Sequence, residues 1–310
     1  MHILITGSSG LIGTALVDAL AAASHRVTRL VRSPSTGGGR RPRGVSDVAW
    51  DPANSSIDAA GLEAEGPFDG VIHLAGAGVG DKRWSPDRKR LIMDSRTQST
   101  SLLVSTLAGF AVPPPVLVSA SAVGFYGDAA DTVLTEASPA GTGFLADVCV
   151  AWERAAAPAA DAGIRTVLLR TGIVLSASGG ALAKQLPLFR LGVGGKIGSG
   201  RQYRSWITLD DEVRVILRCL EDGALSGPVN ATAPHPATDA ELAKAMGAAL
   251  HRPSFLAVPS FALKVALGTE MASDMVLSSQ RVRPGALLAA GFTFTHSDLD
   301  EAVRSVLQPK

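Results

Sequence analysis

Three glycines at three-residue spacing follow the first apolar run of the chain and constrain its fold more than any other feature. Gly7, Gly10 and Gly13 come directly after the run Ile3 to Ile5 and precede an Ala/Leu/Val-rich stretch with helical spacing. This context predicts a strand, a tight turn and a helix that together bind a dinucleotide. Gly7 would turn the backbone, Gly10 would admit a pyrophosphate, and Gly13 would let the helix lie against the strand. An ordinary glycine turn is the alternative.

The first turn of the expected helix supports the same interpretation. Its N–H groups have no partner within the helix, and the helix dipole favours an anion beside them. The neighbours of the glycines, Thr6, Leu11 and Ile12, therefore join the candidate cofactor-binding residues.

The composition is that of a globular protein. Of the 310 residues, 46% are hydrophobic and 18% are charged, so we expect a sizeable core and no extensive disorder. The formal net charge of +1 argues against a nucleic-acid or anionic-membrane partner and leaves a small-molecule substrate as the expected partner. Cys149 and Cys219 lie in apolar helical segments, which favours buried thiols over a disulfide or a metal site.

No targeting or membrane-spanning segment is expected. The chain already has the pattern of a core strand at Ile3, and the apolar stretch from Phe255 to Leu267 is interrupted by Pro259 and Lys264. We therefore expect a cytoplasmic protein.

The end of the second predicted strand indicates which dinucleotide is bound. This strand covers Val27 to Val31, and an Asp or Glu at its end would accept hydrogen bonds from the ribose 2′-hydroxyl of NAD. Arg29 and Arg32 occur there instead, and a guanidinium suits a 2′-phosphate, so NADP(H) is favoured over NAD(H). The alternative is that both arginines are solvated, and it applies more to Arg29 than to Arg32. The loop 33–44 adds Arg40, Arg41 and Arg43, which could touch the phosphate, although a mobile basic loop is the favoured interpretation.

The next two strands add candidates at the same edge of the sheet. A short strand over Val48 to Trp50 ends at Asp51, which could accept from the adenine amino group or simply start a turn. A buried strand, Phe68 to Ala75, is followed by glycines that would let a cofactor pass close to the backbone, and its His73 is interpreted as a core residue. In chain order, the candidate cofactor-binding residues are Thr6, Gly7, Gly10, Leu11, Ile12, Gly13, Arg32, Asp51, Leu74, Ala75, Gly76, Ser119 and Gly172.

Strands and helices continue to alternate with short connections up to residue 175. Strands are expected over 116–121 and within 165–175, and helices over 86–109 and 143–162. This alternation predicts an α/β fold with a parallel sheet covered on both faces. Beyond it, a helix over 210–221 is expected to begin with Asp210 as N-cap.

Motifs along nearly the whole chain resemble those of the extended (atypical) short-chain dehydrogenase/reductases, in the NAD(P)-dependent epimerase/dehydratase group. The resemblance is strongest to the "epimerase family protein" branch, which has its own C-terminal domain. The matching motifs are DKRWSPDRK at 81–89, DSR at 94–96, FLADVCVAWE at 144–153, GSGRQYRSWITLDD at 198–211, NATAPHPATDAELAKAMG at 230–247 and LSSQRVRPGALLAAGFTF at 277–294.

The resemblance implies a domain organisation. Residues 1–175 would form the Rossmann-like NAD(P)-binding domain with its doubly wound parallel sheet, to which a later segment, about 200–232, returns. Residues 176–310 would form a smaller C-terminal substrate lobe that includes the family-specific C-terminal domain, about 255–307.

The resemblance also exposes a missing catalytic pair. Active members of the superfamily use a Tyr and a Lys one helical turn apart, with a Ser that orients the substrate oxygen. Ser121 supplies the Ser. If Glu153 keeps its place relative to the Lys, the Tyr position holds Leu145 and the Lys position holds Cys149, and neither can perform the expected proton transfer.

A substitute pair is one hypothesis. Tyr126 follows Ser121, and Lys82 lies on the loop after the fourth strand, so Lys82 could lower the pKa of the Tyr126 phenol. The candidate catalytic residues are therefore Ser121, Tyr126 and Lys82, although Tyr126 could equally be a packing residue. Arg204 and Asp210 could line the substrate lobe, where Arg204 would bind an acidic ligand.

Two functions follow from these features. One is an NADP(H)-dependent epimerase or reductase that acts on a nucleoside-diphosphate sugar or small carbonyl compound with a non-standard active site. The other is a non-catalytic NADP(H)-binding sensor or scaffold. Either could be a monomer or a homodimer, in which the helices 86–109 and 143–162 pair across a two-fold axis.

Overall fold

The computed structural model describes residues 1–33 and 43–308, and within them the largest element is an eight-stranded sheet. Its strand order is β13-β8-β6-β5-β1-β2-β3-β4, and neighbouring strands are parallel except for β3 and β4. The chain winds outward in both directions from β1 and β5, which creates the point where ligands bind in doubly wound sheets. The strands are β1 (His2–Thr6), β2 (Arg26–Val31), β3 (Val45–Asp51), β4 (Ser56–Ile57), β5 (Gly70–His73), β6 (Val116–Ala122), β8 (Arg165–Thr171) and β13 (Gly227–Ala231).

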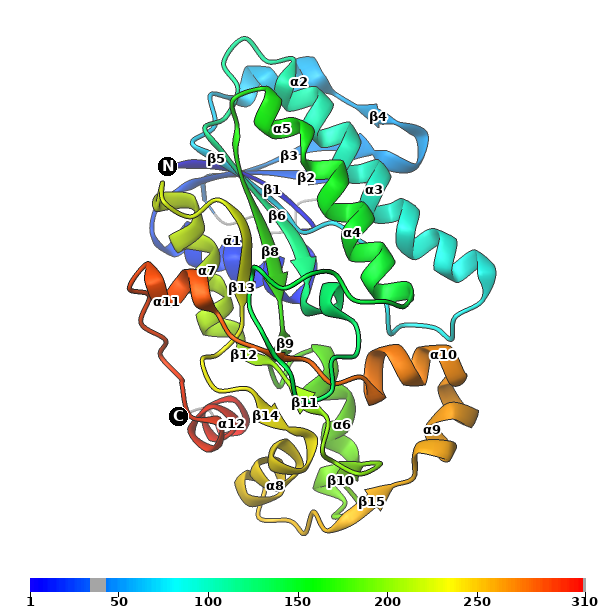
Figure 1. The fold of residues 1–310 in the computed structure, drawn as a ribbon. Helices are drawn as coiled ribbons and strands as arrows, with labels where there is room; N and C mark the ends of the chain where they lie inside the picture. The colour runs from blue at the N-terminus through cyan, green and yellow to red at the C-terminus, as the bar shows by residue number, and fades with distance from the viewer. Residues whose placement is uncertain (34–42, 309–310) are drawn as a thin grey trace.

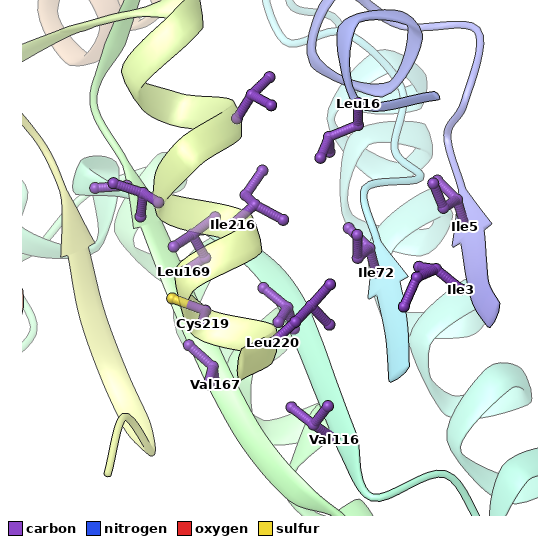
Figure 2. Close-up of a cluster of buried hydrophobic side chains, with 14 of the residues drawn as sticks. Ile3, Ile5, Leu16, Ile72, Val116, Val167, Leu169, Ile216, Cys219 and Leu220 are labelled. Carbon is purple, nitrogen blue, oxygen red and sulfur yellow. The ribbon is translucent and has the colours of Figure 1, made fainter. Parts of the chain in front are cut away.

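Helices cover both faces of this sheet (Figure 1). On one face, Leu16 of α1 and Ile216 of α7 pack with the strand residues Ile3, Ile5 and Ile72 (Figure 2). A separate apolar core fills the opposite face, and the fold class expected from the alternation of strands and helices is confirmed. The helices of the two faces are α1 (Leu11–Ala22) and α7 (Leu209–Glu221), then α2 (Ala59–Glu65), α3 (Pro86–Ala108), α4 (Phe144–Ala156) and α5 (Pro158–Asp161).

A smaller lobe lies beyond the carboxyl ends of the strands and has its own core (Figure 1). Phe189, Trp206 and Met246 are buried there. Three two-stranded pairs, β9–β12, β10–β15 and β11–β14, tie the segments of the lobe together. Its elements are β9 (Ile173–Leu175), α6 (Gly180–Arg190), β10 (Gly195–Ile197), β11 (Tyr203–Arg204), β12 (Trp206–Thr208), β14 (Ala237–Thr238), α8 (Asp239–Ala249), β15 (Leu256–Val258), α9 (Ser260–Leu267) and α12 (Leu299–Leu307).

The C-terminal segment returns from the lobe to the main sheet. Leu287 of α11 joins the core on the α1/α7 face. The short strand β16 pairs in parallel with β7. The predicted lobe, 176–310, therefore includes segments that pack on the sheet. The remaining short elements are η1 (Pro52–Asn54), η2 (Val123–Tyr126), β7 (Val133–Leu134), α10 (Thr269–Met271), the π-helical η3 (Ala272–Leu277), β16 (Arg281–Val282) and α11 (Gly285–Ala289).

Two findings bear directly on expectations from the sequence. The N-cap of α7 is Thr208, whose hydroxyl accepts from Asp211 N at 3.2 Å, so the prediction of Asp210 as the cap was wrong. Asp210 instead lies in the first turn, where a carboxylate also suits the helix dipole. Among the described residues, no helix is long and apolar enough to cross a membrane.

Candidate active site

The turn from Gly7 to Gly13, called the glycine turn below, requires glycine at its two ends. Gly7 has φ +70°, and a Cβ there would lie 2.6 Å from the carbonyl carbon of Leu74. A Cβ on Gly13 would lie 2.2 Å from Gly7 O, so only glycine lets α1 approach the turn this closely. The roles predicted for these two glycines, turning and close packing, match this geometry.

The middle of the glycine turn is open. Ser9 and Gly10 are exposed, and within 4 Å a Cβ on Gly10 would meet only Gly7 O, at 3.3 Å. Gly10 is also the N-cap of α1 and has no side chain to cap the helix, so the N–H groups of Leu11 and Ile12 need an outside acceptor. An open backbone at the positive end of a helix fits a pyrophosphate.

A buried chain of hydrogen bonds supports this turn from below. Thr6 Oγ1 accepts from Leu74 N and Ala75 N, both at 3.2 Å, and lies 2.7 Å from His73 Nδ1. His73 Nε2 lies 2.9 Å from Thr100 Oγ1, whose own proton goes to Arg96 O. These roles are mutually consistent only if Thr6 donates to Nδ1 of a neutral His73. Thr6 is fully buried, so it holds β1 to β5 and does not touch a cofactor with its side chain.

Burial also sets the charge of this histidine. His73 is fully buried, and desolvation lowers its pKa to about 3. The imidazole is therefore neutral, and its interpretation as a core residue is confirmed.

The DSR motif at 94–96 anchors the loop after β5. Ser95 Oγ accepts from Ala77 N at 3.0 Å, and Arg96 Nη1 donates to Ala77 O at 2.9 Å. The Arg96 guanidinium also packs over the Trp152 ring, and burial lowers its pKa. A Cβ on Gly76 would lie 3.2 Å from Arg96 Cζ, so Gly76 makes room for this arginine. The sequence showed the motif but not its role.

The carboxyl ends of β2 and β3 carry the other cofactor candidates. Arg32 is exposed, whereas Arg29 is not available because its Nε pairs with Asp47 Oδ1 at 2.7 Å. Asp51 accepts from Ala53 N at 3.2 Å and from Asn54 Nδ2 at 2.8 Å, which is the turn-starting role considered from the sequence. Arg40 and Arg41, which could touch the phosphate, lie outside the described residues.

Two further cofactor candidates are enclosed. Ser119 is fully buried, so its side chain cannot contact a cofactor. A Cβ on Gly172 would lie 2.5 Å from Ser205 O, so this glycine allows β8 to pack against the lobe. For Ser119 and Gly172, the expectation of direct contact with a dinucleotide is corrected to a packing role.

Five buried side chains form a connected set of hydrogen bonds, called the buried network below. Two of the three candidate catalytic residues, Ser121 and Tyr126, belong to it. Ser121 Oγ donates to Glu153 Oε1 at 2.7 Å. Arg170 forms a bidentate pair with Glu153, at 2.8 and 2.9 Å, and donates to Tyr126 OH at 3.0 Å. Tyr126 OH donates to Asn230 Oδ1 at 2.7 Å. Each of the five is at most 9% exposed, so the network joins β6, η2, α4, β8 and β13 in the interior.

The hypothesis of a Tyr126–Lys82 pair is therefore wrong. Tyr126 faces Asn230 and Arg170, and burial raises the pKa of its phenol despite the nearby arginine. Lys82 is exposed on the loop after β5. Ser121 is also buried, and its only proton goes to Glu153.

Helix α4 presents Leu145 and Cys149 toward η2. A Cβ on Gly124 would lie 3.4 Å from Leu145 Cβ and 3.7 Å from Cys149 Sγ. Burial and the nearby Glu153 carboxylate raise the pKa of the Cys149 thiol to about 11, so it stays protonated. Neither residue offers a group that exchanges a proton near neutral pH.

Comparison with known proteins decides the family. The model of the NAD dependent epimerase/dehydratase family matches residues 3–231. The chain belongs to this family. The "Epimerase family protein Mb2239" of Mycobacterium bovis is 45% identical over 301 residues, which cover 97% of this chain and 96% of that protein. Human "Epimerase family protein SDR39U1" is 34% identical over 310 residues, which cover 99% of this chain and 100% of that protein.

Solved structures of this epimerase family agree with the fold. The crystal structure of human epimerase family protein SDR39U1 (isoform 2) with NADPH matches with a TM-score of 0.88 at 31% identity and covers 100% of both chains. A structure described as the nucleoside-diphosphate sugar epimerase from Corynebacterium glutamicum matches with a TM-score of 0.77 at 36% identity, over 99% of this chain and 58% of that one. The resemblance inferred from the motifs is confirmed.

A second family model covers the C-terminal segment of this epimerase-family protein. It is described as a domain of unknown function (DUF1731) and matches residues 258–306. That segment contacts Arg204, whose Nη2 donates to Val276 O and whose Nε pairs with Asp239 at 3.1 Å. Arg204 is buried, so the predicted role of binding an acidic ligand is corrected to holding the lobe together.

Proposed function

We propose that this epimerase-family protein binds NADP(H) at the glycine turn and uses it to oxidise or reduce a small carbonyl compound or nucleoside-diphosphate sugar. The open backbone at Gly10, between two glycines that admit no side chain, is the observation that carries the proposal. The NADPH in the matching human structure and the sugar-nucleotide description of the Corynebacterium glutamicum protein support it.

Each part of the dinucleotide has a partner in this proposal. The N–H groups of Leu11 and Ile12 would hold the pyrophosphate, and Arg32 would bind the 2′-phosphate. Asp51 stays a candidate for the adenine. When bound, the nicotinamide would supply a hydride acceptor or donor. The chain's own residues would position the substrate and exclude water.

Isothermal titration with NADPH and NADH tests the preference for the 2′-phosphate. Hydrogen bonds to charged groups contribute about 1.5–3 kcal/mol, so Arg32→Ala should weaken NADPH about 10- to 150-fold and leave NADH unchanged. Arg26→Ala is the matched control, because Arg26 opens the same strand and its side chain is 62% exposed. Equal affinities of the unmodified protein for both dinucleotides would remove Arg32 from the site.

A non-catalytic NADP(H) sensor or scaffold is the second candidate. The observation that favours it is the pair Leu145 and Cys149, both without a usable proton. Absorbance of NADPH at 340 nm with a panel of aldehydes, ketones and nucleoside-diphosphate sugars, run in both directions, separates the two functions. Turnover of any panel member supports the enzyme, and binding without turnover across the panel supports the sensor.

A further inference from the structure

A cavity of about 210 Å³ opens beside the α4 positions that lack a catalytic pair. It is lined by Gly124 next to β6, Leu145 of α4 and Asp274 of η3, together with residues of the loops 127–128, 142–143 and 278–280. Sites for drug-sized ligands occupy roughly 300–1,000 Å³. This cavity is smaller, so it suits the reacting end of a ligand whose remainder binds elsewhere.

Asp274 reaches this cavity from a distant part of the chain. Its Oδ2 accepts from Phe144 N at 2.9 Å, across 130 residues of sequence. Gly143 has φ +108°, and a Cβ there would lie 2.9 Å from Asp274 Oδ2, so a glycine makes space for the carboxyl group. In Figure 1 the orange segment that contains α10 lies next to the start of α4, and the Lys89–Glu270 pair, at 2.6 Å, joins α3 to α10.

The hydrogen bond from Phe144 N accounts for Asp274 Oδ2 but not for the place of the carboxyl group in the wall of the cavity. The other titratable side chain in that wall is Asp128, whose Oδ1 already accepts from Ser279 N at 3.0 Å and Ala130 N at 3.3 Å. Asp274 is the one of these two carboxyl groups that bonds to α4, at Phe144 N next to Leu145, so it is the cavity side chain placed to exchange a proton at the position of the missing tyrosine.

We propose that Asp274, supplied by the C-terminal DUF1731 segment, exchanges a proton with the substrate oxygen in place of the missing tyrosine. In the oxidative direction the substrate C–H bond breaks and its hydride passes to the oxidised pyridine dinucleotide. The hydroxyl proton passes to the Asp274 carboxylate, and the products are a carbonyl compound, the reduced dinucleotide and the carboxylic acid. The reductive direction reverses each transfer. The assignment rests on the proposed function.

The surroundings of Asp274 act on its pKa in both directions. Burial and the Glu270 carboxylate raise its pKa, while the N–H groups at the start of α4 and the Lys89 ammonium lower it, and the net shift is upward. Asp128 is the other carboxyl side chain in the lining of the cavity. A carboxyl group shifted toward neutral pH is better matched to proton exchange than an unperturbed one.

Binding of the two cofactor forms tests the assignment without a known substrate. The oxidised nicotinamide ring is cationic and the reduced ring is neutral, so a carboxylate within about 6 Å favours the oxidised form. Asp274→Asn should weaken NADP⁺ about five- to tenfold and leave NADPH unchanged. It should also abolish the pH dependence of the ratio of the two dissociation constants. The amide oxygen of Asn can still accept from Phe144 N, so Asp274→Asn should keep the melting temperature. Asp274→Ser gives up that hydrogen bond and should lower the free energy of unfolding by about 0.5–1.5 kcal/mol.

Asp147→Asn is the matched control, because Asp147 is an exposed carboxylate in the first turn of α4, the helix that Asp274 contacts through Phe144 N. The ratio of the dissociation constants for NADP⁺ and NADPH in Asp147→Asn should equal that of the unmodified protein. A ratio that Asp274→Asn and Asp274→Ser both leave unchanged, in folded protein that binds NADPH, overturns the role of Asp274. If the unmodified protein binds neither dinucleotide, the proposed function itself fails. For any compound that is turned over, Asp274→Asn should lower kcat about 10²- to 10⁴-fold with little change in KM.

Discussion

The glycine turn follows β1 and the buried network lies near the carboxyl ends of β6, β8 and β13, and the two are built in opposite ways. The glycine turn leaves Gly10 and the first N–H groups of α1 open, so it depends on a partner from outside. The buried network pairs Glu153 and Arg170 with each other and with hydroxyl groups. At the carboxyl ends of one sheet, the glycine turn therefore serves binding and the buried network serves stability. A polar residue near a binding site need not belong to that site.

The largest effect should come from breaking the buried network. Glu153→Ala leaves Arg170 buried without its carboxylate, and such a change lowers the free energy of unfolding by about 3–5 kcal/mol. NADPH affinity of the folded protein should not change. Urea denaturation and titration measure the two quantities. Glu270→Ala is the control, because the Glu270 side chain is 51% exposed and its pair with Lys89 should contribute about 0–1 kcal/mol. If Glu153→Ala lost NADPH binding and kept its stability, the buried network would serve binding and not stability.

Gly13→Ala should affect both properties of the glycine turn. A Cβ 2.2 Å from Gly7 O forces α1 away from the turn. Overpacking of this kind costs about 1–3 kcal/mol of stability. NADPH affinity should fall at least tenfold, or about 1.4 kcal/mol, since the N–H groups move. Gly223→Ala is the control, because a Cβ there meets nothing within 4 Å. Full NADPH affinity in Gly13→Ala would place the cofactor elsewhere.

The glycine turn could be predicted from the sequence because its determinants are local. Gly7, Gly10 and Gly13 act on backbone within a few residues, where β1 ends and α1 begins. The core role of His73 was equally evident from its apolar neighbours.

The buried network and the Asp274 contact could not be predicted in the same way. Tyr126 meets Asn230 across 104 residues, and Phe144 meets Asp274 across 130. No periodicity or spacing records such pairs, because they form only when separate segments dock. A tyrosine next to a strand end therefore resembled a catalytic group until its partners were visible. The return of α11 to the main sheet was missed for the same reason.

Two buried titratable groups should give opposite pH dependences on opposite faces of the sheet. Burial raises the pKa of Glu212 to about 8, from 4.5 in the unfolded chain, so the folded state retains a proton that the unfolded state releases. Its contribution to stability is complete below pH 4.5 and is lost as the pH rises toward 8. The pKa of His73, about 3 against 6.5, acts in the other direction, and its contribution is lost as the pH falls from 6.5 toward 3.

Glu212→Gln isolates the first of these two contributions. The urea midpoint of the variant, relative to that of the unmodified protein, should rise between pH 5 and pH 8, because the amide cannot ionise. Glu221→Gln, at the exposed end of the same helix, should follow the unmodified protein. A parallel decline in Glu212→Gln and the unmodified protein would assign the pH dependence to another group.

The smallest effect should come from Tyr126→Phe. The variant loses the hydroxyl that bonds to Asn230 and Arg170, while Arg170 keeps both bonds to Glu153. The free energy of unfolding should fall by about 0.5–1.5 kcal/mol, with NADPH affinity and the NADP⁺ to NADPH ratio unchanged. Tyr203→Phe, at the other tyrosine of the chain, is the control. If a substrate is found and Tyr126→Phe abolishes its turnover without loss of stability, the phenol takes part in the chemistry. The separation of the binding site from the buried network would then fail at Tyr126.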